Sequence, residues 1–462
     1  MEFKVKSKKL IQQFQLIYQV VPALLCLSIS CDSAGVSEMN TSRPNVILIM
    51  ADDLGYETIG ANGGSSYKTP EIDRLAESGM RFEHCYSQPL CTPSRVQLMT
   101  GIYNVRNYVR FGLLDRSQTT FGHLFQNAGY ATCVIGKWQL GKDPASPQHA
   151  GFDRHCLWQV RGGRVDSTRR DTRFSKPVLE VDGELKTFAE TDYGPEVVSD
   201  FGLDFIEKNH KEGTPFFLYY PMILTHCPFS PTPNSPEWQK DSTAVMTYKG
   251  QARYFGDMVA EMDRIVGKIN RKLEELGIKN NTLVIFTGDN GTDKPVVSHM
   301  NGRKVAGAKG KSTDAGTRVP LVVQWPNTIK ASSRNSDLVD FSDFLPTISE
   351  AAGIEVPDSL DIDGRSFLPQ LRNKKGTPRE WIYSWYSRNG KVDKARVFAR
   401  NQRYKLYDSG EFYEVPADYG EQNPLDLDKL DKGARGVHLK LSEVLDHYAK
   451  RRLDKVHKLE QE

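Results

Sequence analysis

The sequence predicts an α/β fold: a large, mostly parallel sheet sandwiched by helices, then a small C-terminal subdomain of antiparallel sheet and helix. Continuous apolar runs alternate with amphipathic helical stretches through most of the chain, as is typical of strands buried on both faces of a parallel sheet. After about residue 375, short aromatic and β-branched runs separated by turns replace that alternation. A length of 462 residues also favours a large domain plus a smaller one.

Residues 1–30 are expected to be an export signal. Four lysines precede residue 10, and a mostly apolar run follows over residues 16–29. This run is short for a helix that spans a membrane. It ends in LSISC, which resembles a bacterial lipoprotein cleavage site at Cys31. We therefore expect an exported, periplasmic or cell-surface protein that meets the membrane only through its signal or a lipid on Cys31. Plain signal-peptidase cleavage is the alternative.

Residues 31–43 are polar and without periodicity, so we expect them to link the leader to the fold. The formal net charge is +3, and the leader alone holds four lysines against one glutamate. The rest of the chain is therefore close to neutral, which gives no support for nucleic-acid binding.

Residues 44–375 are expected to form the large domain. Its strands are predicted at five apolar runs, namely residues 44–50, 131–135, 216–220, 283–286 and 321–324. Its helices are predicted at residues 69–79, 120–128 and 256–276, where proline, threonine or glycine marks the ends. In open α/β sheets, ligands gather at the carboxyl ends of strands. The residues that follow each run are therefore candidates for a functional site.

Residues 376–462 are expected to form the small subdomain. Strands are predicted at residues 381–386, 395–400, 403–407 and 411–415, with a helix within residues 436–451. Seven cysteines occur. Once the leader pair and Cys91 are set aside, four remain, which allows two disulfides in an exported protein without defining the pairing.

Cys91 stands where a helix is predicted to begin. Pro93 suits the first helical turn and Gly101 can end the helix. Cys91 would then lie among unpaired backbone N–H groups at the positive end of the helix dipole, with Arg95 about one turn away. Such a position favours an anion. Without this context, a single cysteine would be read as a small buried apolar residue.

The stretch Cys91-Thr-Pro-Ser-Arg95, followed by Thr100-Gly101, resembles the signature of the type I sulfatases, within the alkaline phosphatase-like superfamily. The resemblance implies that Cys91 is oxidised to formylglycine, whose hydrate attacks sulfur. It also implies a formylglycine-generating enzyme as a partner. The family's large α/β domain with a small C-terminal sheet-and-helix subdomain agrees with the predicted fold.

Acidic side chains follow two of the predicted strands. Asp52 and Asp53 come after the first, and Asp289 and Asn290 come after the run at residues 283–286. Three carboxylates and an amide oxygen would make a hard site suited to Ca²⁺ or Mg²⁺. Each half, taken alone, could also be an ordinary turn. The resemblance implies one Ca²⁺ held by these four residues and by the modified residue 91.

Two lysines and a histidine match further positions of the family pattern. Lys137 follows the run at residues 131–135, and Lys309 precedes the motif that ends in Arg318-Val-Pro. The resemblance implies that both lysines contact the sulfate. Asp314 departs from the glutamate that is usual in that motif. His226 follows the run at residues 216–220 and matches the family's leaving-group acid, a role that needs a proton donor at this edge.

Gln139 departs from the family pattern, which commonly has histidine at this position. That histidine is the usual candidate for the base that lets the covalent sulfate intermediate collapse. Glutamine can hydrogen-bond but is no useful base at neutral pH. We predict that Gln139 slows this step without abolishing catalysis, and that its amide positions a hydroxyl or contacts a sugar.

The substrate is expected to be a sulfated saccharide. An arginine-rich loop at residues 161–173 could grip carboxylate or sulfate groups, although such loops are mostly solvated surface. Trp381, Trp385, Tyr386 and Arg388 could wall a sugar cleft. Two other functions stay open: a phosphodiesterase or phosphonate monoester hydrolase of the same superfold, and a saccharide-binding protein that has lost catalysis.

Overall fold

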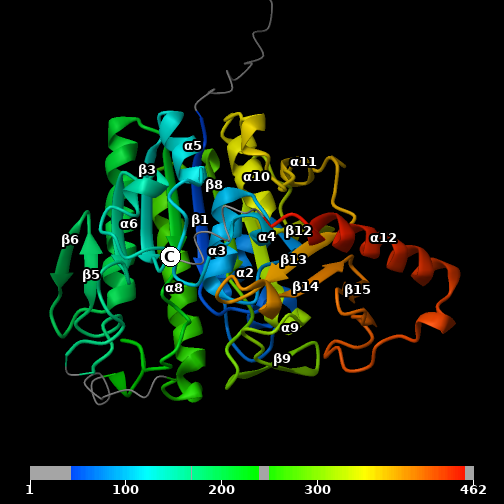
Figure 1. The fold of residues 1–462 in the computed structure, drawn as a ribbon. Helices are drawn as coiled ribbons and strands as arrows, with labels where there is room; N and C mark the ends of the chain where they lie inside the picture. The colour runs from blue at the N-terminus through cyan, green and yellow to red at the C-terminus, as the bar shows by residue number, and fades with distance from the viewer. Residues whose placement is uncertain (1–42, 168, 239–248, 453–462) are drawn as a thin grey trace, which may run out of the picture. The chain divides into compact units, whose positions relative to one another are not determined.

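A computed structural model describes residues 43–167, 169–238 and 249–452. The leader and most of the linker lie outside the described residues. The chain from Arg43 onward forms one compact unit built on a ten-stranded sheet, with strand order β12-β2-β11-β8-β1-β7-β3-β4-β5-β6 (Figure 1). The predicted fold class is confirmed. The boundaries drawn from the sequence at residues 30, 43 and 375 stay predictions.

The centre of the sheet is parallel and fully buried. Its strands are β1 (Asn45–Ala51), β7 (Phe216–Pro221), β8 (Thr282–Gly288) and β3 (Ala131–Lys137). β1 pairs in parallel with β7 and β8, and β3 pairs in parallel with β7. Successive side chains of β1 enter two different cores: Val46, Leu48 and Met50 enter one, and Ile47, Ile49 and Ala51 enter the other. Burial on both faces explains why these strands read as continuous apolar runs.

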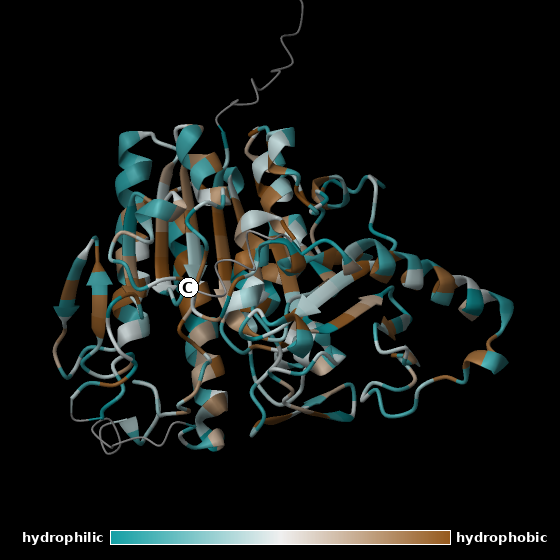
Figure 2. Ribbon diagram, viewed as in Figure 1, coloured by the Kyte–Doolittle hydropathy of each residue, from teal (hydrophilic) through white to brown (hydrophobic). Residues whose placement is uncertain are grey.

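Helices cover both faces. One face packs against α2 (Pro70–Glu77), α6 (Gly194–Glu212) and α8 (Phe255–Glu275), and the other against α3 (Cys91–Thr100), α5 (Phe121–Asn127) and α10 (Phe344–Ala351). Figure 2 shows apolar strands in the middle and polar outer surfaces on the helices. Short helices α4 (Asn104–Asn107) and α11 (Leu368–Leu371) complete the second layer.

Several strands were not predicted. They are β2 (Met80–Tyr86), β4 (Arg154–Trp158), β5 (Val178–Val181), β6 (Glu184–Thr187) and β12 (Ser333–Asp340), with the separate hairpin β9 (Val297–Met300) and β10 (Arg303–Ala306). Polar or charged residues occur within each of them. In β2, for example, Arg81 is buried because its guanidinium donates to Tyr56 Oη at 2.9 Å. A strand whose polar side chains pair with residues elsewhere in the fold is therefore hard to recognise from its local sequence pattern.

The strand at residues 321–324 runs opposite to the expected direction. β11 (Arg318–Gln324) pairs antiparallel with both β8 and β2. Its first residue therefore lies at the edge where β8 and β2 end. The segment that precedes β11 is brought to the same edge as the residues that follow the parallel strands.

The C-terminal sheet is confirmed, and it shares a core with the large sheet. β13 (Ile382–Tyr386), β14 (Arg396–Arg400), β15 (Tyr404–Tyr407) and β16 (Phe412–Glu414) pair antiparallel in that order. The helix α12 (Lys432–Ala449) follows. Their inner side chains, Trp385 among them, join the cluster that also contains α3. Trp385 is therefore a core residue and does not wall a sugar cleft.

A buried charge cluster connects this sheet to the large one. Asp314 begins the short helix α9 (Asp314–Thr317) just before β11, and its carboxylate pairs with Arg400 of β14. Lys405 of β15 pairs with Glu421 at 3.0 Å, and a Glu421 carboxylate oxygen accepts from the Asp314 backbone N–H at 3.2 Å. Burial disfavours charge on Asp314, but Arg400 and Lys405 outweigh it and lower the pKa of its carboxyl.

The five cysteines among the described residues are buried free thiols: Cys85, Cys91, Cys133, Cys156 and Cys227. The two disulfides that the sequence would allow are therefore not formed. Over the described residues, no helix is long and apolar enough to cross a membrane.

Arg400→Met is expected to destabilise the fold by about 3–5 kcal/mol, because it leaves Asp314 charged, buried and without its partner. Urea unfolding followed by intrinsic fluorescence measures this. The double variant Asp314→Leu/Arg400→Met should recover most of the loss, since it removes both charges. A double variant as unstable as the single one would contradict the charge argument.

Candidate active site

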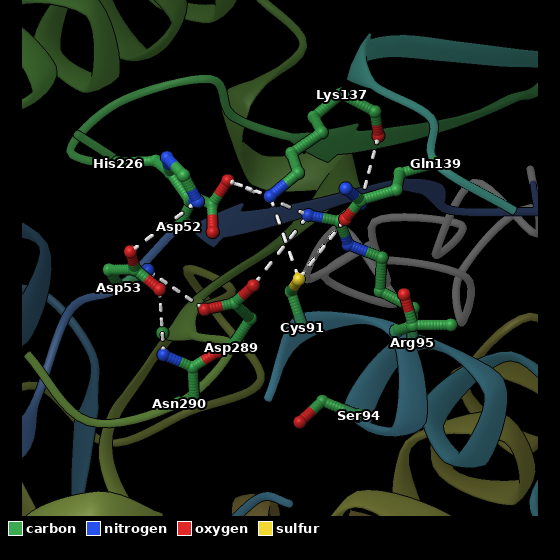
Figure 3. Close-up of polar contacts among 12 residues, drawn as sticks. Asp52, Asp53, Cys91, Ser94, Arg95, Lys137, Gln139, His226, Asp289 and Asn290 are labelled. Carbon is green, nitrogen blue, oxygen red and sulfur yellow. Dashed lines mark hydrogen bonds and ion pairs between the residues drawn. The ribbon is translucent and has the colours of Figure 1, made fainter. Parts of the chain in front are cut away.

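The side chains singled out in the sequence converge at one edge of the large sheet (Figure 3). Asp52 and Asp53 follow β1, Asp289 and Asn290 follow β8, Lys137 ends β3, and His226 lies beyond β7. Cys91 follows the unpredicted strand β2. Lys309 precedes β11 and reaches the same edge because β11 is antiparallel. The structure thus brings all of these residues together, from elements far apart in the chain.

Cys91 is the first residue of α3, and the helix is buried along its whole length. Leu90 precedes it in an extended conformation, and Gly101 ends the helix with φ of 70°, as the sequence predicts. The Cys91 thiol donates to Gln139 Oε1 at 3.2 Å, and Lys137 Nζ lies 3.6 Å from Sγ. Burial raises the pKa of this thiol, although Lys137 opposes the shift.

Arg95 is buried one turn along α3 and is held by main-chain oxygens. Its Nη1 donates to the carbonyl oxygens of Lys137 at 3.3 Å and Trp138 at 3.0 Å. Its Nη2 lies 3.8 Å from Asp52 and 3.6 Å from Asp289. The guanidinium is thus a fixed positive charge behind the carboxylates.

Three carboxylates face one another with no exposure to solvent. Asp289 Oδ1 accepts from the Asp53 backbone N–H at 2.9 Å, and Asn290 Nδ2 donates to Asp53 Oδ1 at 2.8 Å. Burial, together with the charges of Asp52 and Asp53, raises the pKa of Asp289 well above its usual value. Burial also raises the pKa of Asp53 against the attraction of Lys309. Protons on these oxygens would be displaced by a bound cation.

The two lysines are paired with these carboxylates. Lys137 Nζ donates to Asp52 Oδ2 at 2.6 Å, and Lys309 Nζ donates to Asp53 Oδ2 at 2.5 Å. Burial disfavours the charge on Asp52, but Lys137, Arg95 and Lys309 outweigh it and lower the pKa. Three carboxylates are thus balanced by three cations.

The oxygens available for a metal can be identified. Asp52 Oδ1, Asp289 Oδ2 and Asn290 Oδ1 are buried and accept no hydrogen bond from any described residue. Ligand atoms of Asp52, Cys91 and Asp289 lie within 4.8 Å of one another, as do those of Asp52, Asp53 and His226. Buried acceptors without donors are costly, and an all-oxygen set suits a hard dication. The residues therefore fit the metal that the sequence predicts.

His226 lies on the Asp53 side of the cluster, with Nε2 at 3.8 Å from Asp53 Oδ2. Burial and the charges of Lys309, Lys137 and Arg173 lower the pKa of its imidazole well below the usual value. Arg173 is a residue whose position here the sequence did not predict. Its guanidinium is 1% exposed and lies 3.1 Å from His226 Nδ1. It is therefore too deep to grip a saccharide, and no local pattern in the loop indicates this.

A cavity of about 700 Å³ opens beside Gln139. Its lining includes Arg110, Lys142 and Arg161. Arg161 is partly neutralised by Glu180 at 2.9 Å. Arg388 lies over the ring of Phe111, which also lines the cavity, at 5.0 Å. Gln139 has φ of 50°, a left-handed conformation that is uncommon outside glycine, and its amide lies between this cavity and Cys91.

Comparisons with known proteins agree with this geometry. The family model described as Sulfatase matches residues 44–354, and one described as N-sulphoglucosamine sulphohydrolase, C-terminal, matches residues 311–447. The chain belongs to the sulfatase family. It is a sulfuric ester hydrolase, and the resemblance seen around Cys91 is confirmed.

The matches to individual relatives extend over most of the length of this sulfatase. N-acetylgalactosamine-6-sulfatase of Mus musculus is 32% identical over 374 residues, which cover 74% of this chain and 68% of that protein. Arylsulfatase A of Bos taurus is 32% identical over 400 residues, with 79% and 75% covered. The crystal structure of Ps i-CgsB matches with a TM-score of 0.74 at 26% identity, over 89% of this chain and 94% of that one. Ps i-CgsB in complex with k-i-k-neocarrahexaose matches with a TM-score of 0.73 at 25% identity, with the same shares covered.

Gln139→His in this sulfatase is expected to raise KM for a sulfated saccharide by about 2- to 10-fold, the range for one lost hydrogen bond, without raising kcat. The reason is that the Gln139 amide lies at the mouth of the cavity. Steady-state kinetics measure both constants. The matched control is Gln126→His, on the exposed side of α5, which should change neither. A rise in kcat would instead mean that histidine restores a missing base.

Proposed function

We propose that this sulfatase is exported and removes sulfate from a carbohydrate. It would use one bound Ca²⁺ and a formylglycine made from Cys91. The observation that carries the proposal is the position of Cys91. It is the first residue of a buried helix, with Lys137 Nζ 3.6 Å from its sulfur and the carboxylate cluster beside it. Unpaired N–H groups at a helix start favour an anion, so this position suits a sulfate-bearing substrate better than a structural thiol.

Formylglycine, as its hydrate, would supply a hydroxyl nucleophile for sulfur at this position. Around it, Lys137 would hold a hydroxyl and a sulfate oxygen, and Arg95 would keep the α3 end positive. Lys309 would bind a second sulfate oxygen, since its ammonium is anchored on Asp53 at the same edge. Fixed cations that meet developing negative charge lower the barrier without reorganising during the reaction.

Ca²⁺ would be held by Asp52, Asp53, Asp289, Asn290 and the modified residue 91. Three cations already balance the three carboxylates. A bound dication would therefore leave the site positive, which suits the anionic sulfate ester, and would polarise a sulfate oxygen. The acceptors without donors on Asp52, Asp289 and Asn290 support this ligand set.

His226 would serve the departing alcohol, because its Nε2 lies on the side of the cluster that Lys309 also faces. A hydrogen-bond donor there stabilises the oxygen as the S–O bond breaks. Gln139 lies on the opposite side of Cys91 and cannot act as a base. Water or a neighbouring group would therefore take the proton when the enzyme-bound sulfate breaks down.

A sulfated saccharide is proposed as the substrate because the cavity beside Gln139 is large enough for sugar units and carries arginine and lysine on its lining. The relative named N-acetylgalactosamine-6-sulfatase and the solved Ps i-CgsB complex with k-i-k-neocarrahexaose support the same class. Export, lipid attachment at Cys31 and maturation by a formylglycine-generating enzyme are proposed from the sequence.

The protein, produced with a formylglycine-generating enzyme, is expected to hydrolyse aryl sulfates with a higher kcat/KM than the matching aryl phosphates. An aryl sulfate is a monoanion and an aryl phosphate is mostly a dianion at neutral pH, so a preference for the sulfate ester cannot come from charge attraction alone and tests selectivity for sulfur. In the tryptic peptide covering residues 82–95, mass spectrometry should find formylglycine at Cys91 and an unmodified thiol at Cys85.

Preference for phosphate or phosphonate esters would favour a phosphorus hydrolase of the same fold. Active protein with only an unmodified Cys91 would overturn the formylglycine mechanism. A fully converted Cys91 without turnover of aryl sulfates or sulfated saccharides would favour the saccharide-binding alternative.

Ca²⁺ is expected to raise Tm relative to protein in EGTA, because it relieves repulsion among the three carboxylates. At a free Ca²⁺ concentration of 100 times Kd, the free energy of unfolding would rise by about 2.7 kcal/mol. Differential scanning calorimetry measures the accompanying rise in Tm. Asp289→Asn should lose most of the gain. The control Asp204→Asn removes an exposed carboxylate on α6 and should keep it. An unchanged Tm for the wild type on adding Ca²⁺ would contradict the site.

A further inference from the structure

The cavity beside Gln139 is lined by charges of one sign. Its volume is about 700 Å³, and its walls come from the segment before α5 and from the residues that follow β3 and β4. Arg110, Lys142 and Arg161 line it, whereas none of the described residues on its lining is an aspartate or a glutamate. A cleft lined by one sign of charge concentrates the opposite charge inside it. The lining therefore favours an anionic group over a neutral sugar.

These cations are not the ones that surround Cys91. Lys137, Lys309 and Arg95 pair with the carboxylates at the edge of the sheet. The cavity lies beyond Gln139, whose Oε1 accepts from the Cys91 thiol at 3.2 Å (Figure 3). A substrate with its sulfate at Cys91 would extend past Gln139 to enter the cavity. The cations of the cavity would then meet a different part of the same molecule.

Arg161 is anchored at the cavity wall, unlike a solvated surface arginine. Its Nε donates to Glu180 Oε2 at 2.9 Å, and its Nη2 donates to the Gly183 carbonyl oxygen at 2.8 Å. The Glu180 side chain is 1% exposed, and a buried carboxylate is costly unless a cation pairs with it. A guanidinium has five N–H donors, so these two bonds leave N–H groups on both η nitrogens. Two such nitrogens side by side suit a bidentate contact with a carboxylate or a sulfate.

Arg110 and Lys142 add two exposed cations to the anchored one. Neither forms an ion pair with any residue in the described part of the chain. Asp143, the acidic residue next to Lys142, pairs with Arg116 instead. One carboxylate, that of Glu180, thus stands against three cations at this cavity. A bound anion would balance the excess of positive charge.

We propose that this cavity binds a second anionic group of the substrate, a carboxylate or a second sulfate, with Arg161 as its principal contact. The substrate class is then a saccharide with at least two anionic groups, of which the sulfate at Cys91 is the one removed. The inference rests on the proposed function for the reaction. The binding itself can be measured without turnover.

The first test is isothermal titration calorimetry with Ca²⁺ present and with Cys91 left as a thiol. The probes are sulfated disaccharides in matched pairs. In one set a uronate is a free carboxylate or its methyl ester, and in the other a galactose disaccharide carries two sulfates or one. In the set that matches the cavity, loss of the second anion should weaken binding roughly 10- to 100-fold, as expected for a hydrogen bond to a charged group. No difference within either set, or no binding of any probe, would overturn the proposal.

The second test repeats this titration with variants. Arg161→Gln should remove most of the difference between the doubly and singly charged probes, and Arg161→Lys, which keeps the charge but not the fork, should retain part of it. Arg154→Gln is the matched control. Arg154 begins β4, at the opposite end from the cavity, pairs with Asp182 at 2.8 Å, and is 41% exposed against 39% for Arg161. It should leave the difference unchanged, and equal effects of Arg161→Gln and Arg154→Gln would overturn the proposal.

Steady-state kinetics with a doubly charged saccharide that the enzyme hydrolyses should divide the effect between KM and kcat. Arg161→Gln should raise KM and change kcat little, because a group away from the breaking bond is bound equally in the substrate and in the transition state. The same variant should lose less kcat/KM on 4-nitrophenyl sulfate, which has no second anion. A loss confined to kcat would overturn the proposal, since it would mean damage at the reaction centre.

The proposed function fails separately. If the wild type hydrolyses no sulfate ester but Arg161→Gln removes its preference for doubly charged probes, the proposed activity is wrong and the anion site in the cavity stands. If the wild type hydrolyses aryl sulfates but shows no such preference, only the cavity inference is wrong. Melting temperatures identify any variant that is unfolded, and Arg161→Lys then carries the comparison.

Discussion

Three carboxylates buried against one another are the constraint on which the rest of this structure depends. Asp52, Asp53 and Asp289 have no access to water, and uncompensated charges in such a place cost several kcal/mol each. Compensation comes from cations on three separate elements: β3, α3 and the segment before β11. The strand order, the reversed direction of β11 and the position of α3 are all needed to bring these charges together.

The two-sided core explains how such a cluster stays in place. Each central strand is packed on both faces, and the C-terminal sheet extends the core that holds α3. The charged side chains therefore project from backbone that cannot shift, which is the condition for a preorganised site. The buried pair of Arg400 with Asp314 continues this pattern beyond the site, since it joins β14 to the segment leading into β11.

The sequence predicted the parts of this fold that depend on local pattern. Fully buried strands such as β1 appear as apolar runs, and the start of α3 follows from Pro93. Strand β2 was missed because Arg81, Glu83 and His84 interrupt its apolar residues, and the partner that buries Arg81, Tyr56, lies elsewhere in the chain. Site residues were predicted from strand ends and motif spacing. Arg173 was misread as a surface cation, because the contacts with Trp158 and His226 that bury it are tertiary.

The order of these parts along the chain determines the order in which the site can assemble during synthesis. Cys91 is 1% exposed in the folded protein, so an enzyme that modifies it can reach it only while the surrounding chain is still open. The first acidic pair is made early in synthesis, whereas Lys309 and β11 are added some 200 residues after Cys91. The edge of the sheet cannot close before then. The late arrival of β11 thus leaves Cys91 an interval of accessibility, and slower synthesis between these points would lengthen it.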